Sequence, residues 1–367
     1  MVPSRVMPAS AKSPPASAKS PIRVLVIGAG FGAKVHAPGF KADPGFRLVG
    51  IASERLESAK AAAAAHDIPY ATDDWKRMLE EVDADLVSVV TPVDLHYPMA
   101  RAALERKRHV LLEKPFALNV AQAKELAALA KTQGVVNVIN HEFRYYPARA
   151  ALTRLIQEGR LGNLEHIAVR DRLPGWARDP SRRLTWLSDR QRGGGYLGAL
   201  GSHHLDALML WAGPIRRIFC TLRSLAPRAA AHSPAHQAIT AEDCFTMLLD
   251  FESGATGIVD LFGGGRARRE RFEVFGSEDA LTILDPWRLG RANESGEVDD
   301  VPIPADLDLK RTKSVPSLAP FGALLSRLKA AIRGDGTIEP TFADGVRIQE
   351  ALDAARKSDQ SGRWVKV

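Results

Sequence analysis

A glycine-rich turn after the first apolar segment places the strongest constraint on the fold of this chain. Residues 22–27 are typical of a buried strand, and the next six residues, GAGFGA at 28–33, match the pattern G-x-G-x-x-A. In a strand–turn–helix unit the first glycine permits the tight turn, the second lets the backbone approach a pyrophosphate, and the small third residue keeps helix and strand close. The pattern predicts a dinucleotide-binding loop formed by Gly28, Gly30, Phe31, Gly32 and Ala33.

Strand-like and helix-like segments alternate from residue 22 to residue 140. After the first strand, apolar runs predict parallel strands at residues 47–51, 86–90, 109–112 and 135–139. Between them, helices are predicted at residues 56–65, 97–105 and 120–131. This alternation is typical of a doubly wound parallel sheet. We therefore expect a Rossmann NAD(P)-binding domain over residues 21–142.

Strand-like segments follow one another with little helix between them later in the chain. They lie at residues 164–169, 215–222, 244–251, 256–262, 271–275 and 280–284. Helices are predicted at residues 147–158, 203–211, 321–332 and 342–357, and long polar loops at 171–192 and 225–241. Consecutive strands with short turns indicate a mostly antiparallel open sheet. The fold class is therefore α/β, with an α+β domain for substrate binding and oligomerisation over residues 143–367.

Composition narrows the class of protein. The chain has 367 residues, of which 45% are hydrophobic and 25% charged, as in ordinary globular proteins. No apolar run approaches the ~20 residues that span a bilayer, so we expect no membrane partner. Two cysteines, Cys220 and Cys244, make neither a disulfide framework nor a zinc site, and they fit a reducing cytoplasm without a bound metal.

The net charge of +7 is diffuse and gives little support to nucleic-acid binding. Three of these charges come from Arg5, Lys12 and Lys19 in the first twenty residues, which contain no acid. This segment is rich in Ser, Pro, Ala and Lys, so residues 1–20 are predicted to be a disordered tail.

The segment after the second predicted strand bears on the choice between NAD and NADP. An NAD site usually has an acid at the end of this strand, and here Ser53 holds that position. Serine leaves room for a 2′-phosphate, and Arg55 is close enough in sequence to pair with it. Glu54 offers the alternative of binding a 2′-hydroxyl, or it faces solvent. On balance the sequence favours NADP(H) over NAD(H).

Glu113-Lys114-Pro115 follows the predicted strand at 109–112. A lysine just past the carboxyl end of a parallel strand lies where open α/β sheets bind ligands. Together with the glycine loop, it suggests hydride chemistry in which Lys114 donates or accepts a proton. The alternative is a solvated lysine that pairs with a carboxylate.

These motifs resemble the glucose–fructose oxidoreductase/inositol dehydrogenase/rhizopine catabolism family over nearly everything after Pro21. Besides the glycine loop, the resemblance rests on Thr91-Pro92 with His96, on residues 113–115, on GGG at 193–195, on GSHHLD at 201–206, on Glu242-Asp243 and on residues 358–364. The motifs are specific for the family and unspecific for its substrate.

The resemblance implies roles for individual residues. Thr91, Pro92 and His96 would belong to the cofactor site, Glu113 would contact the nicotinamide ribose, and Lys114 would be the catalytic lysine. The Lys114–Pro115 peptide bond would be cis, as is frequent in the family.

His203 matches the family histidine and would accept the proton of the substrate hydroxyl. Asp206, one turn later on the same helix face, would orient the ring and contact the substrate, or else have a structural role as a cap. The alternative for His203 is a buried, hydrogen-bonded structural histidine. One departure stands out, because family members often have Asp four residues before the histidine, where this chain has Ala199. The full lysine–aspartate–histidine set therefore does not carry over.

Further substrate contacts are predicted at the domain junction and in a long loop. Arg144 and Tyr145 follow the last Rossmann strand, and Arg144 suits a carboxylate or hydroxyl-rich ligand, or else an interdomain salt bridge. Trp176 lies in the loop at 171–192, where it closes over a substrate or covers the sheet.

The sequence thus predicts an NAD(P)-dependent dehydrogenase or reductase for a small sugar-like or cyclic hydroxyl or carbonyl compound. Two alternatives stay open. One is a glycoside-cleaving enzyme of the same family with tightly held NAD, and the other is a non-catalytic dinucleotide-sensing regulator. An open sheet must bury its outer face, and the family does so by assembly, so we expect a homodimer or homotetramer.

Overall fold

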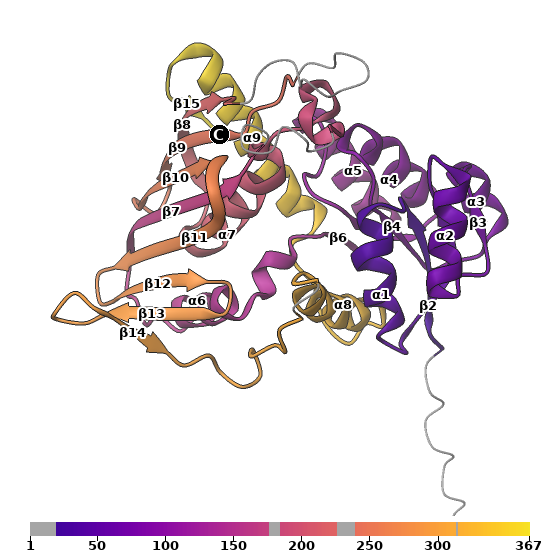
Figure 1. Cartoon of the computed structure of the whole chain (residues 1–367), viewed down its shortest axis with the longest axis horizontal. Helices are drawn as coiled ribbons and strands as arrows, with labels where there is room; N and C mark the ends of the chain where they lie inside the picture. The colour runs from indigo at the N-terminus through magenta and orange to yellow at the C-terminus, as the bar shows by residue number, and fades with distance from the viewer. Residues whose placement is uncertain (1–19, 176–183, 226–238, 313–314) are drawn as a thin grey trace, which may run out of the picture.

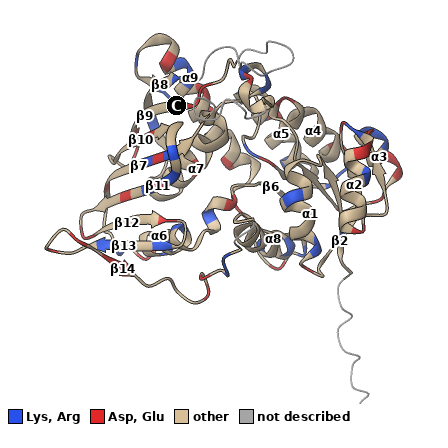
Figure 2. Ribbon diagram, in the orientation of Figure 1, with Lys and Arg blue, Asp and Glu red and all other residues tan. Residues whose placement is uncertain are grey.

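Two β-sheets form the framework of the chain (Figure 1). The computed structural model describes residues 20–175, 184–225, 239–312 and 315–367. Six parallel strands make the first sheet, and nine strands make the second. This confirms the predicted α/β fold class with a Rossmann-like first part and an open sheet in the second. Figure 2 shows basic and acidic residues on both halves of the molecule.

The parallel sheet has the strand order β3-β2-β1-β4-β5-β6, which reverses direction between β1 and β4. Its strands are β1 (Ile22–Ile27), β2 (Phe46–Ala52), β3 (Ala71–Thr72), β4 (Leu86–Val89), β5 (His109–Leu112) and β6 (Asn137–Ile139). The central strand β4 is buried at every position, as expected for a sheet covered on both faces. Ligands bind such sheets outside the carboxyl ends of the strands, at the point where the order reverses.

Helices cover both faces of this sheet. They are η1 (Gly32–His36), which is a π-helical turn, α1 (Ala37–Lys41), α2 (Leu56–His66), α3 (Trp75–Glu81), the short η2 (Val93–Leu95), α4 (His96–Glu105) and α5 (Val120–Gln133). Local residues set the two ends of α5. The Asn119 side chain accepts a hydrogen bond from the backbone N–H of Gln122 at the start, and Gly134 ends the helix in the left-handed conformation. Strand β3 and helix α3 were not predicted, because both are too short to show a clear period.

The nine-stranded sheet has the order β14-β13-β12-β11-β7-β10-β9-β8-β15. Its strands are β7 (Leu164–Pro174), β8 (Ile215–Arg223), β9 (Cys244–Phe251), β10 (Thr256–Phe262), β11 (Gly264–Gly276), β12 (Ala280–Asp285), β13 (Arg288–Ala292), β14 (Val298–Val301) and β15 (Val365–Lys366). All described neighbours are antiparallel except β7 and β10. The mostly antiparallel sheet was therefore predicted correctly.

Several strand limits differ from the prediction. Strand β7 continues through residue 174 into the segment 171–192 that was assigned to a loop, and β11 begins at Gly264 rather than at residue 271. Strands β13, β14 and β15 were not predicted. The added segments are rich in charge, and their pairing with neighbouring strands, rather than an apolar pattern, makes them strands.

One face of the nine-stranded sheet packs on α6 (Pro147–Gln157), α7 (Ser202–Ala212) and α9 (Phe342–Ser361), which share one apolar core with it. The short helices η3 (Glu142–Tyr145), η4 (Trp186–Ser188), η5 (Arg190–Arg192) and η6 (Leu197–Gly201) connect these elements. Helix α9 begins with a reciprocal capping box between Thr341 and Asp344. The outer face carries exposed apolar side chains, including Leu248 (39% exposed) and Phe275 (42%).

Helix α8 (Leu318–Ile332) returns to the parallel sheet (Figure 1). Its Phe321 and Leu325 belong to the same buried cluster as Val35 and Phe40. Gly39 is required at this crossing, because a Cβ there would lie 2.6 Å from the Phe321 ring. The division at residue 142 remains a prediction, and part of the chain beyond it stabilises the Rossmann core.

Three predicted features lie outside the described residues. These are the N-terminal tail up to residue 19, Trp176, and most of the predicted loop at 225–241. Within the described ranges, no helix is both long enough and apolar enough to cross a membrane.

Candidate functional site

A cavity of about 880 Å³ lies at the carboxyl ends of β1, β2, β4 and β5. Its lining includes many of the predicted site residues, namely Gly28, Gly30, Phe31, Ser53, Thr91, Pro92, Glu113 and Lys114. Glu142, Phe143, Trp186, Arg192 and Ala199 line it from the second part of the chain. Its size and its place at the reversal of strand order suit a dinucleotide together with a small substrate.

The glycine loop leaves room where a pyrophosphate would approach. Gly28 has φ +115°, and a Cβ on it would lie 2.1 Å from the Val90 carbonyl oxygen, so only glycine fits. A Cβ on Gly30 would meet nothing within 4 Å, which means that this backbone faces open space. Gly32 and Ala33 begin the helical turn behind the loop rather than line the cavity, and the Ala33 carbonyl accepts from His66 Nε2 at 2.9 Å.

The segment after β2 places two of its three candidate residues at the cavity. Ser53 and Glu54 line it, joined by Asp73 and Trp75 from the segment after β3. Arg55 is exposed at the start of α2 and is not part of the lining. Sequence reasoning missed Asp73 and Trp75, since β3 itself was not predicted.

His96 does not line the cavity, in contrast to its predicted place in the cofactor site. Its buried ring bridges two loops that do, with Nε2 at 2.9 Å from the Thr91 carbonyl and Nδ1 at 3.0 Å from the Pro115 carbonyl. Burial lowers the pKa of His96. The residue therefore holds the loops after β4 and β5 together.

Glu113 is a buried carboxylate fixed by two residues that the sequence did not single out. His36 Nε2 lies 2.9 Å from Glu113 Oε1, and Asn140 Nδ2 donates to the same oxygen at 2.5 Å. Burial alone would raise the pKa of Glu113, but the His36 hydrogen bond and charge and the nearby Lys114 hold it below its ordinary value. Glu113 is therefore already held by protein partners in an ionised state.

Lys114 projects into the cavity between the two parts of the chain. The Lys114–Pro115 peptide bond is cis. The Lys114 Nζ donates to the main-chain carbonyl of Ala199 at 3.0 Å. Ala199 lies in η6, a π-helical turn in front of α7. The position that lacks the expected carboxylate thus supplies a neutral carbonyl to the lysine.

His203 is placed differently from its predicted catalytic position. It is 1% exposed and does not line the cavity. Its ring stacks on Phe143, with centroids 3.8 Å apart, and its Nδ1 lies 3.3 Å from His141 Nδ1. Burial and the nearby positive charge of Lys114 hold the pKa of His203 well below its ordinary value. His203 is therefore screened from the cavity, and its contact with substrate stays a prediction.

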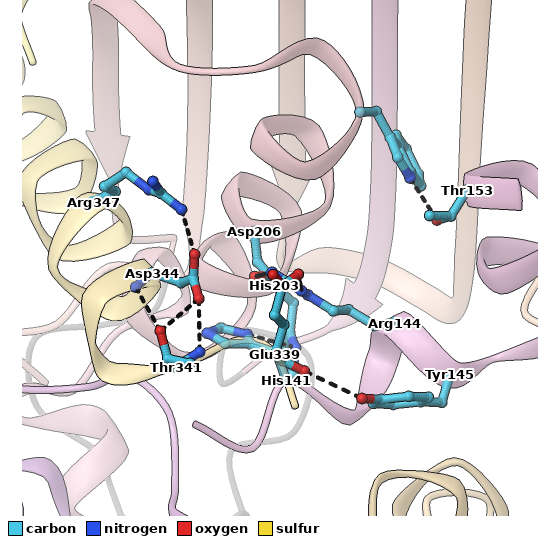
Figure 3. Close-up of polar contacts among 11 residues, drawn as sticks. His141, Arg144, Tyr145, Thr153, His203, Asp206, Glu339, Thr341, Asp344 and Arg347 are labelled. Atoms are coloured by element: carbon cyan, nitrogen blue, oxygen red, sulfur yellow. Dashed lines mark hydrogen bonds and ion pairs between the residues drawn. The ribbon is translucent and has the colours of Figure 1, made fainter. Parts of the chain in front are cut away.

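Arg144 and Asp206 form an ion pair rather than part of the large cavity (Figure 3). Arg144 Nε and Nη2 donate to the two Asp206 carboxylate oxygens at 2.7 and 2.6 Å. Both residues line a separate cavity of about 210 Å³, and the Tyr145 hydroxyl donates to the Glu339 carbonyl at 3.2 Å. Arg144, Tyr145 and Asp206 thus lie outside the lining of the large cavity, and their substrate contacts stay a prediction. The ion pair of Arg144 is made within the second predicted domain rather than between the two domains.

Among the described ranges, one group of side chains has the spacing of metal ligands, namely Asp171, His204 and Glu270, whose ligand atoms lie within 4.8 Å of one another. Two arginines already contact its carboxylates. Arg149 Nη2 lies 2.8 Å from Glu270 Oε1, and Arg268 Nη2 lies 3.7 Å from Asp171 Oδ2. Because these guanidinium groups balance the carboxylates, we interpret the group as an ion-pair network.

A glycine loop at the reversal of strand order and a lysine facing the same cavity define a dinucleotide-dependent oxidoreductase. The chain belongs to the oxidoreductase family whose models describe an NAD-binding Rossmann fold, matched at residues 22–141, and a C-terminal alpha/beta domain, matched at residues 153–367. This confirms the family predicted from the motifs.

Similar proteins extend over nearly the whole chain. An uncharacterised oxidoreductase of Synechocystis sp. is 30% identical, over 95% of this chain and 97% of its own length. The levoglucosan dehydrogenase of Pseudarthrobacter phenanthrenivorans is 26% identical, over 94% and 98%. A solved structure of levoglucosan dehydrogenase in complex with NADH and L-sorbose superposes with a TM-score of 0.83 at 25% identity, over 95% of this chain and 99% of that one.

Proposed function

We propose that this protein transfers hydride between a nicotinamide dinucleotide and a hydroxyl or carbonyl group of a sugar-like compound. One observation carries the proposal: the cavity joins a glycine loop, which has room for a pyrophosphate, to Lys114, which can exchange a proton. Similar proteins support it, because levoglucosan dehydrogenase and the D-apiose dehydrogenase of Paraburkholderia graminis act on sugars.

Residues along the cavity would contact successive parts of the dinucleotide. Backbone amides around Gly28 and Gly30 would face the pyrophosphate, and Thr91 and Pro92 would line the path toward the nicotinamide. Glu113 would contact the nicotinamide ribose. A bound cofactor supplies the hydride acceptor or donor, and the protein fixes its orientation.

The choice between NAD(H) and NADP(H) depends on the segments after β2 and β3. The predicted NADP(H) preference needs Arg55 beside a 2′-phosphate, but Arg55 does not line the cavity, whereas the acidic Glu54 and Asp73 do. Acidic residues repel a 2′-phosphate and accept hydrogen bonds from a 2′-hydroxyl. These observations favour NAD(H), which we adopt, and the NADP(H) preference stays an untested prediction.

Lys114 is assigned to the substrate oxygen. Its Nζ has three N–H donors. One donates to the Ala199 carbonyl, so two remain for a ligand. An ammonium group at this place stabilises negative charge on the substrate oxygen in the transition state and can exchange a proton with it.

The exposed apolar face of the nine-stranded sheet is assigned to self-association. Leu248 on β9 and Phe275 on β11 lie on this face. Exposed apolar residues of a sheet are typical of an interface, so a homodimer or homotetramer is expected, to be measured by light scattering. A cytoplasmic location is consistent with the free, buried Cys220 and Cys244.

The decisive experiment is to identify the cofactor and to follow hydride transfer. Mass spectrometry of the purified protein, followed by NADH fluorescence during incubation with sugars and sugar derivatives, gives both answers. Net reduction or oxidation of the nicotinamide with a sugar-like compound supports the proposal. Turnover with no net change of a tightly held NAD would favour the glycoside-cleaving alternative, and dinucleotide binding without turnover of any compound would favour the regulator.

A further inference from the structure

The substrate end of the cavity lacks the carboxylate that the family resemblance places at position 199. Lys114 binds the Ala199 carbonyl instead, and a carbonyl cannot take up the proton that a hydroxyl releases on oxidation. Glu113 Oε1 is bonded to His36 and Asn140, and these partners and Lys114 hold the pKa of Glu113 low, so this carboxylate is a poor proton acceptor. The next acidic side chain of this lining is Glu142, which sequence reasoning did not single out.

We propose that Glu142 is the carboxylate that exchanges the proton with the substrate oxygen, and that His203 is a positioning residue behind it. This inference rests on the proposed hydride transfer and names a catalytic residue for it. It moves the proton exchange from Lys114 and His203 to Glu142, and it leaves Lys114 as the hydrogen-bond donor that stabilises charge on the substrate oxygen.

Glu142 lines the cavity although its side chain is almost fully buried. It begins η3, directly after the last Rossmann strand and its loop, and it lines the cavity together with Lys114 and Phe143. The side chain is 4% exposed, and its Oε2 has no hydrogen-bond partner among the described residues. Buried polar atoms normally find partners, so an orphaned oxygen on a carboxylate that lines a cavity indicates that the side chain gains a partner when a small rotation turns it toward a ligand or toward His203.

His203 reaches the substrate only through Glu142. Its Nε2 lies 3.9 Å from Glu142 Oε2 and likewise has no hydrogen-bond partner among the described residues. The ring cannot turn freely, because Phe143 stacks on it and His141 contacts its Nδ1. Figure 3 shows His203 and His141 close together beside the Arg144–Asp206 pair. A small movement of Glu142 would bring its carboxylate within hydrogen-bond distance of this fixed ring.

The surroundings of Glu142 tune it for proton exchange near neutral pH. Charged or titratable groups face it from the segment after β5, from the start of α6 and from α7, namely Glu113, Lys114, Tyr146, Arg149 and His203. Burial, and after it the negative charge of Glu113, raises the pKa of Glu142 to about 8, against the opposing charges of Lys114 and Arg149. A carboxyl group with such a pKa exists in both forms near neutral pH, as a general acid–base requires.

The chemistry balances with Glu142 in this role. In the oxidation direction, the substrate C–H bond breaks and its hydride goes to the nicotinamide. The hydroxyl O–H bond breaks and its proton goes to the Glu142 carboxylate, while the C–O bond becomes a carbonyl. Lys114 donates a hydrogen bond to that oxygen throughout. The neutral Glu142 then returns its proton to water, and in the reduction direction it donates the proton to the new hydroxyl.

The test compares Glu142→Gln with wild type and with Glu294→Gln, an exposed control in the turn between β13 and β14. Glu142→Gln should lower kcat by ~100- to 10,000-fold, the usual effect of losing a general acid–base, with NAD(H) affinity unchanged. In wild type, kcat/KM for oxidation should rise as pH passes about 8, because the base must be ionised. His203→Gln should lower kcat less and shift this pH dependence without raising KM.

A second readout does not use activity. Difference infrared spectra of the cofactor-free protein between pH 6 and pH 9 should contain a band of a buried protonated carboxyl that Glu142→Gln removes and Glu294→Gln keeps. Near-normal turnover of Glu142→Gln, or an unchanged infrared band, would overturn the assignment. Failure of the proposed function is distinguishable, because wild type itself would then transfer no hydride.

Discussion

The raised pKa of Glu142 predicts that the site destabilises the fold in alkaline solution. The ordinary pKa of a glutamate is 4.5, and burial together with the charge of Glu113 raises that of Glu142 to about 8. A raised carboxyl pKa means that the folded protein binds this proton more tightly than the unfolded chain does. The resulting stability is fully present below pH 4.5 and is lost as pH rises to about 8. At about 1.4 kcal/mol per unit, the loss is about 5 kcal/mol.

Glu142→Gln isolates this effect, because glutamine stays neutral at every pH and has nearly the same shape. The unfolding free energy of the variant minus that of wild type should increase by about 3 kcal/mol between pH 6 and pH 9. Urea unfolding at both pH values measures the two free energies, and subtracting wild type cancels the other titrating groups. Glu294→Gln should show a flat difference. A flat difference for Glu142→Gln as well would refute the burial argument for this carboxyl.

Four further variants test other parts of the site. Gly30→Val should abolish dinucleotide binding but leave the melting temperature nearly unchanged, because a Cβ there meets open space and the branched side chain occupies the pyrophosphate position; unaltered NADH titration would exclude this loop. Ser53→Asp should weaken NADP(H) binding more than NAD(H) binding, measured as the ratio of the two dissociation constants, and an unchanged ratio would show that this residue does not face the ribose. Lys114→Ala should lower kcat by ~100- to 10,000-fold with little change in cofactor affinity, and near-normal turnover would remove the lysine from the mechanism. Asp206→Asn should lower the unfolding free energy by roughly 3 kcal/mol, because it leaves the half-buried Arg144 guanidinium with only the exposed Glu339 carboxylate as a charge partner, and a large rise in KM at unchanged stability would instead place Asp206 at the substrate.

The glycine loop shows what local sequence can determine. The turn, the approach of the backbone and the following helical turn all depend on residues 28–33, so the pattern predicted the place of the loop at the cavity. The alternation of strands and helices likewise predicted the parallel sheet, since each strand carries its own apolar run. The local sequence pattern did not predict β13 and β14. These segments are strands because they pair with neighbouring strands, not because they carry an apolar run of their own.

The site residues differ in the same way, because some are placed by local sequence and others by tertiary packing. Lys114 was predicted from its position after β5, because the end of a strand in a parallel sheet is a defined place. Arg55 was placed in the cofactor site by its position in the sequence, and His96 by the family resemblance. The Arg55 side chain is exposed to solvent, and the His96 ring lies between two loops.

The sequence by itself determined the fold class and the family, and it predicted the dinucleotide loop and the lysine, since each depends on short-range order along the chain. Only the tertiary structure placed Glu142 in the lining of the same cavity as that lysine. Glu142, Ala199 and His203 come from segments up to 61 residues apart in sequence, and the packing of η3 against α7 sets which of them borders the cavity. Such packing depends on the side-chain volumes of both elements together, here the stacking of Phe143 on His203, and no pattern within either segment contains it.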